Sequence, residues 1–375
     1  MKRVVVLGST GSIGRSALDV IGRSPSEFRI VGLSAGSNAR LLEEQASLFN
    51  VDLIGMSAEP SGGIKGRHIV SGRDAAVRIV AEAGPDIVVN GISGAAGFLP
   101  SLQAVRQGAV LALANKESLV IGGSFITDEA ARSGSRIIPV DSEHSAVFQC
   151  LSGESREEIR RIILTASGGP FRTRPKETFG DITPEEALNH PTWSMGSRIT
   201  IDSATMMNKG LEIIEAFWLF GVDLESIEVA IHPQSIVHSM VEFRDMSVKA
   251  QMGIPDMRVP IAYALSWPRR MALSFKPLDL ASMTKLEFFP PDGEKFPALK
   301  LARSAMEQPR CLPCVMNAAD EVAVGGFLGR RIRFNEIMDI VRKTMDKLAG
   351  SRVDSPADLM ELDTQSRKIA ENMVS

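Results

Sequence analysis

The sequence is poor in cysteine and aromatic residues, and it has neither long apolar runs nor an excess of basic charge. Three cysteines in 375 residues exclude a disulfide framework and fit a reducing compartment. Lys+Arg number 42 against 45 Asp+Glu, so no basic surplus can neutralise a nucleic-acid backbone. No apolar run reaches the roughly 18–20 residues of a membrane span. We therefore expect a cytoplasmic protein with no nucleic-acid or membrane partner.

The first 140 residues alternate short apolar runs with helical patterns. The runs are rich in Val, Ile and Leu without polar alternation, as in strands that are buried on both faces. This alternation predicts a doubly wound parallel sheet. The expected strands are Val4–Leu7, Arg29–Leu33, Val51–Met56, Asp86–Asn90, Ala109–Ala114 and Arg136–Val140.

The pattern changes after about residue 140. Strands are expected at 161–165 and 199–202, and closely spaced strands at 227–232, 235–242 and 248–252 suggest antiparallel pairing. A proline-rich stretch then indicates an extended connector, and the remainder has helical spacing. We predict an α/β protein with a Rossmann-like parallel sheet (1–140), a central α+β catalytic domain (141–270), a connector (271–297) and a C-terminal helical bundle (298–375).

A glycine-rich segment, Gly8–Gly14, follows the first expected strand and opens a helix. Its G-x-x-G-x-x-G spacing differs from the usual fingerprint, but its place in the first βα turn predicts a dinucleotide site. An NAD site usually has Asp or Glu at the end of the second strand. Here the segment has no carboxylate and continues to Arg40, which favours NADP because Arg40 can pair with a 2′-phosphate. Alternatively, Arg40 is simply a solvated helix residue.

Carboxylates follow another expected strand. Asp141 and Glu143 are two residues apart, so an extended backbone would place both on one side, where hard oxygens suit Mg²⁺ or Mn²⁺. Glu212 supplies a third carboxylate, and Asn208 stands four residues before it on the same helix face. The alternative is an ordinary surface helix.

Three further segments have polar residues suited to a ligand. Thr165–Pro170 can form an anion nest or be a plain turn, and His190–Gly196 can close over a ligand. Lys116, at the end of the fifth expected strand, can contact a substrate oxygen. The Cys311-x-x-Cys314 pair lacks the further ligands of a zinc site and is read as two buried small residues.

Taken together, these motifs resemble the 1-deoxy-D-xylulose 5-phosphate reductoisomerase family. The matching segments span most of the chain: LGSTGSIG at 7–14, ANKE at 114–117, PVDSEH at 139–144, SGGPF at 167–171, HPTWSMG at 190–196 and DSATMMNKG at 202–210.

The resemblance implies a cytoplasmic homodimer that uses NADPH and a divalent cation (Mn²⁺, Mg²⁺ or Co²⁺). The implied reaction rearranges the phosphorylated sugar 1-deoxy-D-xylulose 5-phosphate and reduces it to 2-C-methyl-D-erythritol 4-phosphate, on the non-mevalonate route to isoprenoid precursors. The implied metal ligands are Asp141, Glu143 and Glu212, which with Lys116 and His190 form the catalytic set.

Two larger sets follow from the resemblance. The implied substrate contacts are Lys116, Ser142, Glu143, Ser167, His190, Ser203, Asn208, Lys209 and Glu212. The implied NADPH contacts are Thr10, Gly11, Ser12, Ile13, Gly36, Ser37, Asn38, Asn115, Glu117 and Gly196. One position departs from the pattern: some members have Lys where this chain has Ser37, and Arg40 is the candidate that compensates.

Two other functions remain open from the residues alone. One is an NADP-dependent oxidoreductase that performs no rearrangement, and the acidic triad argues against it because simple hydride transfer needs no metal. The other is a non-catalytic NADP-binding sensor, which the intact acidic, lysine and lid motifs disfavour.

Overall fold

The computed structural model describes residues 1–58, 66–189, 196–307 and 311–374. These residues form two compact units. The first unit contains Met1–Ser118, Ser124–Ser145 and Asp256–Phe275, and the second contains Leu119–Gly123, Ala146–Pro255 and Lys276–Ser375. Each unit is therefore assembled from segments that are far apart in the sequence.

The first unit is built on a parallel sheet of seven strands in the order β4-β3-β2-β1-β5-β6-β7. This confirms the predicted parallel sheet, whose apolar strands are buried by helices. Sequence reasoning missed only β4 among these strands. The strands are β1 (Lys2–Leu7), β2 (Phe28–Ala35), β3 (Leu53–Met56), β4 (His68–Ser71), β5 (Ile87–Asn90), β6 (Val110–Leu113) and β7 (Ile137–Pro139).

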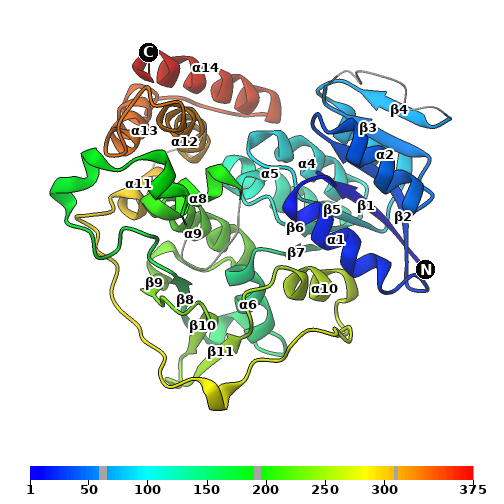
Figure 1. Ribbon diagram of the computed structural model, residues 1–375, viewed down its shortest axis with the longest axis horizontal. Helices are drawn as coiled ribbons and strands as arrows, with labels where there is room; N and C mark the ends of the chain where they lie inside the picture. The colour runs from blue at the N-terminus through cyan, green and yellow to red at the C-terminus, as the bar shows by residue number, and fades with distance from the viewer. Residues whose placement is uncertain (59–65, 190–195, 308–310, 375) are drawn as a thin grey trace. The chain divides into compact units, whose positions relative to one another are not determined.

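Helices cover both faces of this sheet (Figure 1). The strand order reverses direction at β1, so right-handed crossovers put α1 and α2 on one face and α3 and α4 on the other. A later helix, α10, packs against α1, β6 and β7. The helices are α1 (Ser12–Gly22), α2 (Ala39–Leu48), α3 (Ala75–Ala83), α4 (Phe98–Arg106), α5 (Glu117–Ser133) and α10 (Arg258–Ser266).

The second unit contains a smaller sheet in the order β11-β10-β8-β9. Its strands are β8 (Ile159–Ala166), β9 (Ile227–Ile231), β10 (Val237–Phe243) and β11 (Val248–Met252). As predicted, β10 and β11 are antiparallel, but β9 pairs in parallel with β8 rather than with β10. The strand expected at 199–202 is wrong. These residues lie in α8 (Ser197–Thr205), because a short β-branched run fits one buried helix face as well as a strand.

Helices complete the second unit. α9 packs against α8 and α11, and α12 packs against α13 and α14, which confirms a helical C-terminal region. Residues 276–297 run largely extended (yellow in Figure 1). The remaining helices are α6 (Ser142–Cys150), α7 (Pro184–Leu188), α9 (Met207–Phe220), α11 (Ala298–Glu307), α12 (Leu312–Leu328), α13 (Glu336–Lys347) and α14 (Pro356–Val374).

The core of the second unit includes a cluster of phenylalanine rings. Phe334 meets Phe171, Phe179 and Phe327 edge-on, at ring-centroid distances of 5.3, 5.6 and 5.5 Å. Such edge-to-face contacts add to the stabilisation from apolar burial. These contacts join the segment after β8, which holds Phe171 and Phe179, to the C-terminal region. The domain boundaries expected at residues 140, 270 and 297 remain a prediction.

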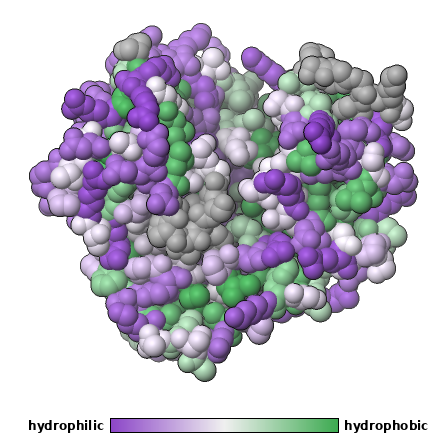
Figure 2. All heavy atoms as spheres, viewed as in Figure 1, coloured by the Kyte–Doolittle hydropathy of each residue, from purple (hydrophilic) through white to green (hydrophobic). Residues whose placement is uncertain are grey.

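The helices described in the structure include none that is long and apolar enough to span a lipid bilayer. Figure 2 shows hydrophilic residues spread over the face in view, with hydrophobic residues in smaller areas between them.

Candidate functional site

The glycine-rich loop after β1 has a backbone that only glycine permits. Gly8 has φ +68°, and a Cβ at this position would lie 2.7 Å from the carbonyl oxygen of Gly91. A Cβ on Gly14 would lie 2.3 Å from the carbonyl oxygen of Gly8. The loop therefore folds tightly against its own helix, and α1 begins at Ser12 with Gly11 as its N-cap. The amides at this helix start are available to an anion.

Buried hydrogen bonds fix this loop to the next βα unit. The Ser9 amide donates to the Ser34 carbonyl oxygen (2.8 Å), and the Ser9 hydroxyl donates to Gln45 Oε1 (2.8 Å). Gln45 Nε2 in turn donates to the Ser9 carbonyl oxygen (2.9 Å). Gln45 was missed by sequence reasoning, although a glutamine on the apolar face of a predicted helix is a detectable signal.

A cavity of about 250 Å³ opens beside this loop at the carboxyl edge of the sheet. Its lining includes Thr10 and Gly11 from the loop, Gly36 after β2, and Arg73 after β4. It contains no Asp or Glu among the described residues. The cavity lies where a doubly wound sheet binds a dinucleotide, at the point where the strand order reverses.

The other residues expected near this cavity have local roles. Ile13 packs against Gly91, where a Cβ would lie 3.0 Å from Ile13 Cγ2. The Asn38 side chain caps α2 by accepting from the Leu41 amide (3.1 Å). The Ser37 carbonyl oxygen accepts from the Ala39 amide (2.9 Å). Arg40 is exposed and pairs with Glu44 (3.0 Å), so it is not part of the cavity lining.

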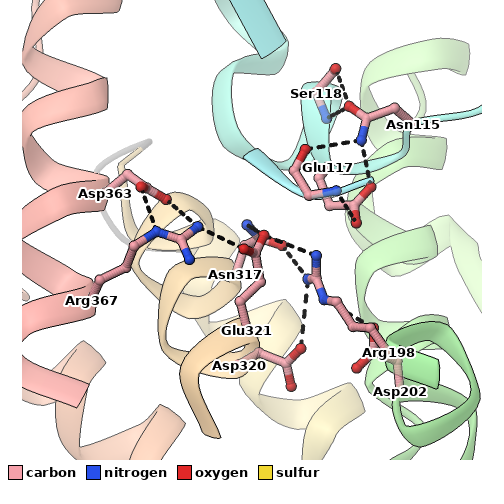
Figure 3. Close-up of polar contacts among 11 residues, drawn as sticks. Asn115, Glu117, Ser118, Arg198, Asp202, Asn317, Asp320, Glu321, Asp363 and Arg367 are labelled. Carbon is pink, nitrogen blue, oxygen red and sulfur yellow. Dashed lines mark hydrogen bonds and ion pairs between the residues drawn. The ribbon is translucent and has the colours of Figure 1, made fainter. Parts of the chain in front are cut away.

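Asn115 and Glu117, after β6, form a buried network (Figure 3). Asn115 Nδ2 donates to the Gly94 carbonyl oxygen (3.0 Å) and to Glu117 Oε2 (2.8 Å). Glu117 Oε1 accepts from the Gly94 amide (3.0 Å). Because the segment before Gly94 lines the cavity, these two residues hold one wall of it in place. Their predicted contact with the cofactor remains a prediction.

A charged pair lies at the ends of β6 and β7. Lys116 Nζ is 2.5 Å from Asp141 Oδ2, and both side chains are about nine-tenths buried. His144 Nδ1 is 3.3 Å from Asp141 Oδ1. Burial alone would raise the pKa of Asp141, but Lys116 and His144 outweigh it and hold that pKa well below its ordinary value. The Asp141 carboxylate is therefore ionised at neutral pH and fit to bind a cation.

Ser142 and Glu143 open α6 directly after this pair. The Glu143 amide donates to Asp141 Oδ1 (3.3 Å), and the Ser142 hydroxyl lies 2.5 Å from Glu143 Oε2. The two carboxylates lie together as predicted, since one oxygen of Asp141 and one of Glu143 are within 4.8 Å of each other, but the expected extended backbone is wrong. The backbone turns into a helix at Ser142, and Asp141 caps that turn.

In the second unit, the loop after β8 packs on α8. Gly168 and Gly169 have φ +85° and +68°, and a Cβ on Gly169 would lie 2.7 Å from the Ser203 carbonyl oxygen. The Ser167 hydroxyl oxygen accepts from the Gly169 amide (3.2 Å). The predicted residues Ser167 and Ser203 are thus brought to neighbouring turns, where hydroxyls and amides suit an anion.

The predicted polar face of α9 is present but buried. Asn208 Nδ2 donates to Glu212 Oε1 (2.6 Å), and Lys209 Nζ pairs with Glu212 Oε2. The exposed fractions of Lys209 and Glu212 are 3% and 1%. An ordinary surface helix is therefore excluded, since long charged side chains are rarely buried without a structural or functional reason. Gly196 precedes α8 as its N-cap, whereas His190 lies outside the described residues.

A second buried charge cluster was not predicted (Figure 3). Arg198 on α8 pairs with Glu321 (2.9 Å) and lies 3.7 Å from Asp320 on α12. Arg367 on α14 bonds to the same Glu321 (2.8 Å) and to Asp363 (2.7 Å). Only i,i+4 spacing within each helix was visible in the sequence, and nothing there indicated which helices meet.

Cys311 and Cys314 are buried, as predicted, and burial raises the pKa of both thiols. Thiols with raised pKa values are poor nucleophiles and poor metal ligands at neutral pH. This pair therefore has no place in the candidate site.

Comparisons with known proteins agree with this geometry. Residues 4–123 match the family 1-deoxy-D-xylulose 5-phosphate reductoisomerase, and residues 137–220 and 252–369 match C-terminal domains of the same enzyme. The 1-deoxy-D-xylulose 5-phosphate reductoisomerase of Geotalea uraniireducens is 52% identical over 92% of both chains.

Solved structures agree over the whole chain. The reductoisomerase from Zymomonas mobilis in complex with NADPH has a TM-score of 0.91 at 42% identity, over 100% of this chain and 99% of that one. A DOX-P reductoisomerase complex with NADPH, fosmidomycin and magnesium has a TM-score of 0.94 at 37% identity, over 100% of this chain and 98% of that one. Fold and sequence thus define an α/β oxidoreductase. The chain belongs to the 1-deoxy-D-xylulose 5-phosphate reductoisomerase family, which confirms the predicted family and enzyme class.

Proposed function

We propose that this protein converts 1-deoxy-D-xylulose 5-phosphate to 2-C-methyl-D-erythritol 4-phosphate with NADPH and a divalent cation. The observation that carries the proposal lies within the first unit. The glycine-lined cavity and the ionised Asp141 both follow the carboxyl ends of strands in one parallel sheet. The carboxyl ends of parallel strands lie at one edge of a sheet, so the proposed cofactor and cation bind at the same edge.

The residues fit NADPH. Gly8 and Gly14 leave no room for side chains where the backbone approaches a pyrophosphate, and Thr10 and Gly11 line the cavity at the start of α1. The cavity contains no carboxylate among its described residues to repel a 2′-phosphate. Ser12, Ile13, Gly36, Ser37, Asn38, Asn115, Glu117 and Gly196 complete the proposed cofactor set.

The donor set also fits a hard divalent cation. We assign its ligands to the carboxylates of Asp141, Glu143 and Glu212, which suit Mg²⁺, Mn²⁺ or Co²⁺. When bound, such a cation supplies Lewis-acid stabilisation of negative charge on substrate oxygens during the carbon-skeleton rearrangement. We assign to Lys116, whose ammonium pairs with Asp141, the role of donating a hydrogen bond to a substrate oxygen.

The substrate phosphate is assigned to the second unit. Ser167 and Ser203 lie on neighbouring turns, and Asn208 and Lys209 follow on α9, which packs against α8. Their hydroxyl, amide and ammonium donors suit a phosphate dianion. His190 and Ser142 are the further proposed substrate contacts. Anchoring the phosphate away from the reacting carbons orients the substrate for rearrangement and hydride transfer.

The test is NADPH oxidation, followed by absorbance, with 1-deoxy-D-xylulose 5-phosphate and either Mn²⁺ or Mg²⁺. We expect turnover that EDTA abolishes and that Glu143→Gln reduces at least about 100-fold, with NADPH affinity unchanged. Glu228→Gln is the matched control, because Glu228 is exposed and pairs with Arg161 on the surface. Folded protein that binds NADPH without oxidising it would reject the proposed reaction.

We further propose that the enzyme is a cytoplasmic homodimer joined through β11. Among the described residues β11 is the last strand of its sheet, and it begins with the exposed side chain of Val248. Such an edge pairs readily with a copy of itself across a two-fold axis. Light scattering should give twice the 40.5 kDa mass of one chain. A mass of one chain at micromolar concentration would reject the dimer.

A further inference from the structure

The segment after β2 leaves the selection of NADPH over NADH unexplained. Gly36, Ser37 and Asn38 contain no carboxylate that would repel a 2′-phosphate, but they also supply no positive charge. Arg40 pairs with Glu44 along α2 and does not line the cavity. A positive charge must therefore come from another part of the cavity.

Arg73 supplies that charge from a different strand. It follows β4 in the turn that leads into α3, and it lines the same cavity as Gly36. The turn is fixed by its backbone, because the Gly72 amide donates to the Met56 carbonyl oxygen at the end of β3 (3.0 Å). The Ala75 amide then donates to the Gly72 carbonyl oxygen (3.0 Å), which starts the helix.

The strand order places Arg73 on the ribose side of the cavity. Strands β1, β2, β3 and β4 are consecutive neighbours, spaced about 4.8 Å apart, and end at one edge. The glycine loop follows β1 and Gly36 follows β2, so a dinucleotide with its pyrophosphate at the loop has its adenosine ribose near Gly36. The groups beyond that ribose then face the ends of β3 and β4, where Ser57 and Arg73 line the cavity.

The gap between these strand ends is held at a fixed width. The Ser57 amide donates to the Ala35 carbonyl oxygen (3.2 Å), and the Ala58 amide donates to the Gly36 carbonyl oxygen (3.1 Å). The end of β3 is thereby joined to the segment after β2. A phosphate attached to the ribose would meet the Ser57 hydroxyl and the Arg73 guanidinium, and these backbone hydrogen bonds hold the Ser57 segment in place.

Arg73 is also available for a ligand. It forms no hydrogen bond or ion pair with any residue in the described parts of the chain, whereas Arg67 pairs with Glu43 (3.2 Å) and Arg78 with Glu82 (3.8 Å). It is the cation among the described lining residues, and none of those residues is acidic. A guanidinium presents a planar pair of donors that matches two phosphate oxygens.

We propose that Arg73, assisted by Ser57, recognises the 2′-phosphate of NADPH and so sets the preference of this enzyme for NADPH. The proposal rests on the proposed use of NADPH. The positive charge that selects NADPH is then supplied after β4, by Arg73, and not by the segment after β2, where this chain has Ser37.

The experiment compares Arg73→Gln with the wild type by direct binding, monitored by protein fluorescence. The probes are NADPH, NADH, 2′,5′-ADP and 5′-ADP. We expect Arg73→Gln to weaken NADPH and 2′,5′-ADP about 10- to 100-fold, as the loss of a charge-assisted pair predicts, and to leave NADH and 5′-ADP within twofold. Arg40→Gln is the matched control and should leave all four dissociation constants within twofold.

A second variant tests the charge rather than the position. Adding Ser37→Lys to Arg73→Gln should recover most of the lost NADPH affinity, because it restores a cation beside Gly36. Equal weakening of NADPH and NADH by Arg73→Gln, or a larger effect of Arg40→Gln, would overturn the assignment. Wild-type protein that binds neither NADPH nor 2′,5′-ADP would instead reject the proposed function, so the two failures are distinguishable.

Discussion

The cofactor cavity of the first unit and the charge cluster of the second unit are specified in different ways. The cavity is shaped by backbone: Gly8 and Gly14 are required because a Cβ would collide with neighbouring main chain. The cluster is made by side chains, with Arg198 on α8 reaching Asp320 and Glu321 on α12. A backbone site is encoded within a few consecutive residues, whereas a side-chain cluster depends on helices that meet only after folding.

The largest expected effect comes from removing the central cation of the cluster. Arg198→Met removes the cation that Asp320 and Glu321 share and leaves Glu321 paired with Arg367 alone, and breaking a buried ion pair costs about 3–5 kcal/mol. We expect the free energy of unfolding, measured with urea, to fall by that amount. Arg342→Met is the control. Arg342 pairs on the surface with Asp339 (3.3 Å), so its loss should change stability by less than about 1 kcal/mol.

Equal stabilities for Arg198→Met and Arg342→Met would remove the contrast between the two regions. The cluster would then be a passive group of polar side chains rather than a stabilising element of the second unit.

A smaller effect, on binding rather than on stability, is expected in the cavity. Gly14→Ala would place a Cβ 2.3 Å from the Gly8 carbonyl oxygen and 2.4 Å from Ser9 Cα, so the loop must move. We expect NADPH affinity to fall about 100-fold, since the helix start no longer meets the pyrophosphate. Gly22→Ala on the same helix meets only the Phe49 ring, at 3.6 Å, and should bind normally. Normal NADPH binding by Gly14→Ala, measured by fluorescence, would contradict a cavity shaped by backbone.

The smallest expected effect concerns pH. Burial, and then the negative charge of Asp202, raise the pKa of Asp320 well above its ordinary value of 3.8. A raised folded-state pKa contributes stability that is present below pH 3.8 and is lost as pH rises through the folded-state value. Asp320→Asn removes this loss, so its stability relative to the wild type should increase with pH.

Urea unfolding at pH 5 and pH 8 measures this difference. Asp339→Asn, on the surface of α13, should show no such trend. A stability difference between Asp320→Asn and the wild type that is independent of pH would show that Asp320 is ionised throughout that range.

Most of the first unit was predictable because its signals are local. The strands β1, β2, β5 and β6 are apolar runs followed by turn residues, and the Gly8–Gly14 segment stands directly after one of them. β4 was missed because its four residues, His68–Ser71, have a polar residue at each end, so the apolar run is too short to predict a strand. That omission also concealed Arg73, whose place in the cavity follows only from the position of β4 in the sheet.

The second unit was predicted less completely for a physical reason. Asn208, Lys209 and Glu212 were recognised from helical spacing, and the structure joins them by direct contacts. The Arg198 cluster was not recognised, because Arg198 and Asp320 are over a hundred residues apart and no local pattern pairs them. The prediction of a strand at 199–202 was wrong for a related reason. Ile201 is buried because α8 packs against other parts of the unit, and no local pattern shows that packing.

The position of α10 has a consequence for the order of synthesis. Asp256 follows Ser145 by roughly 110 positions, yet both belong to the first unit. At about 5–20 residues per second, a ribosome needs roughly 6–22 seconds to cross that interval. Until α10 emerges, the apolar surface that it covers on α1, β6 and β7 has no cover. A nascent chain of this length therefore exposes apolar surface that the finished protein covers.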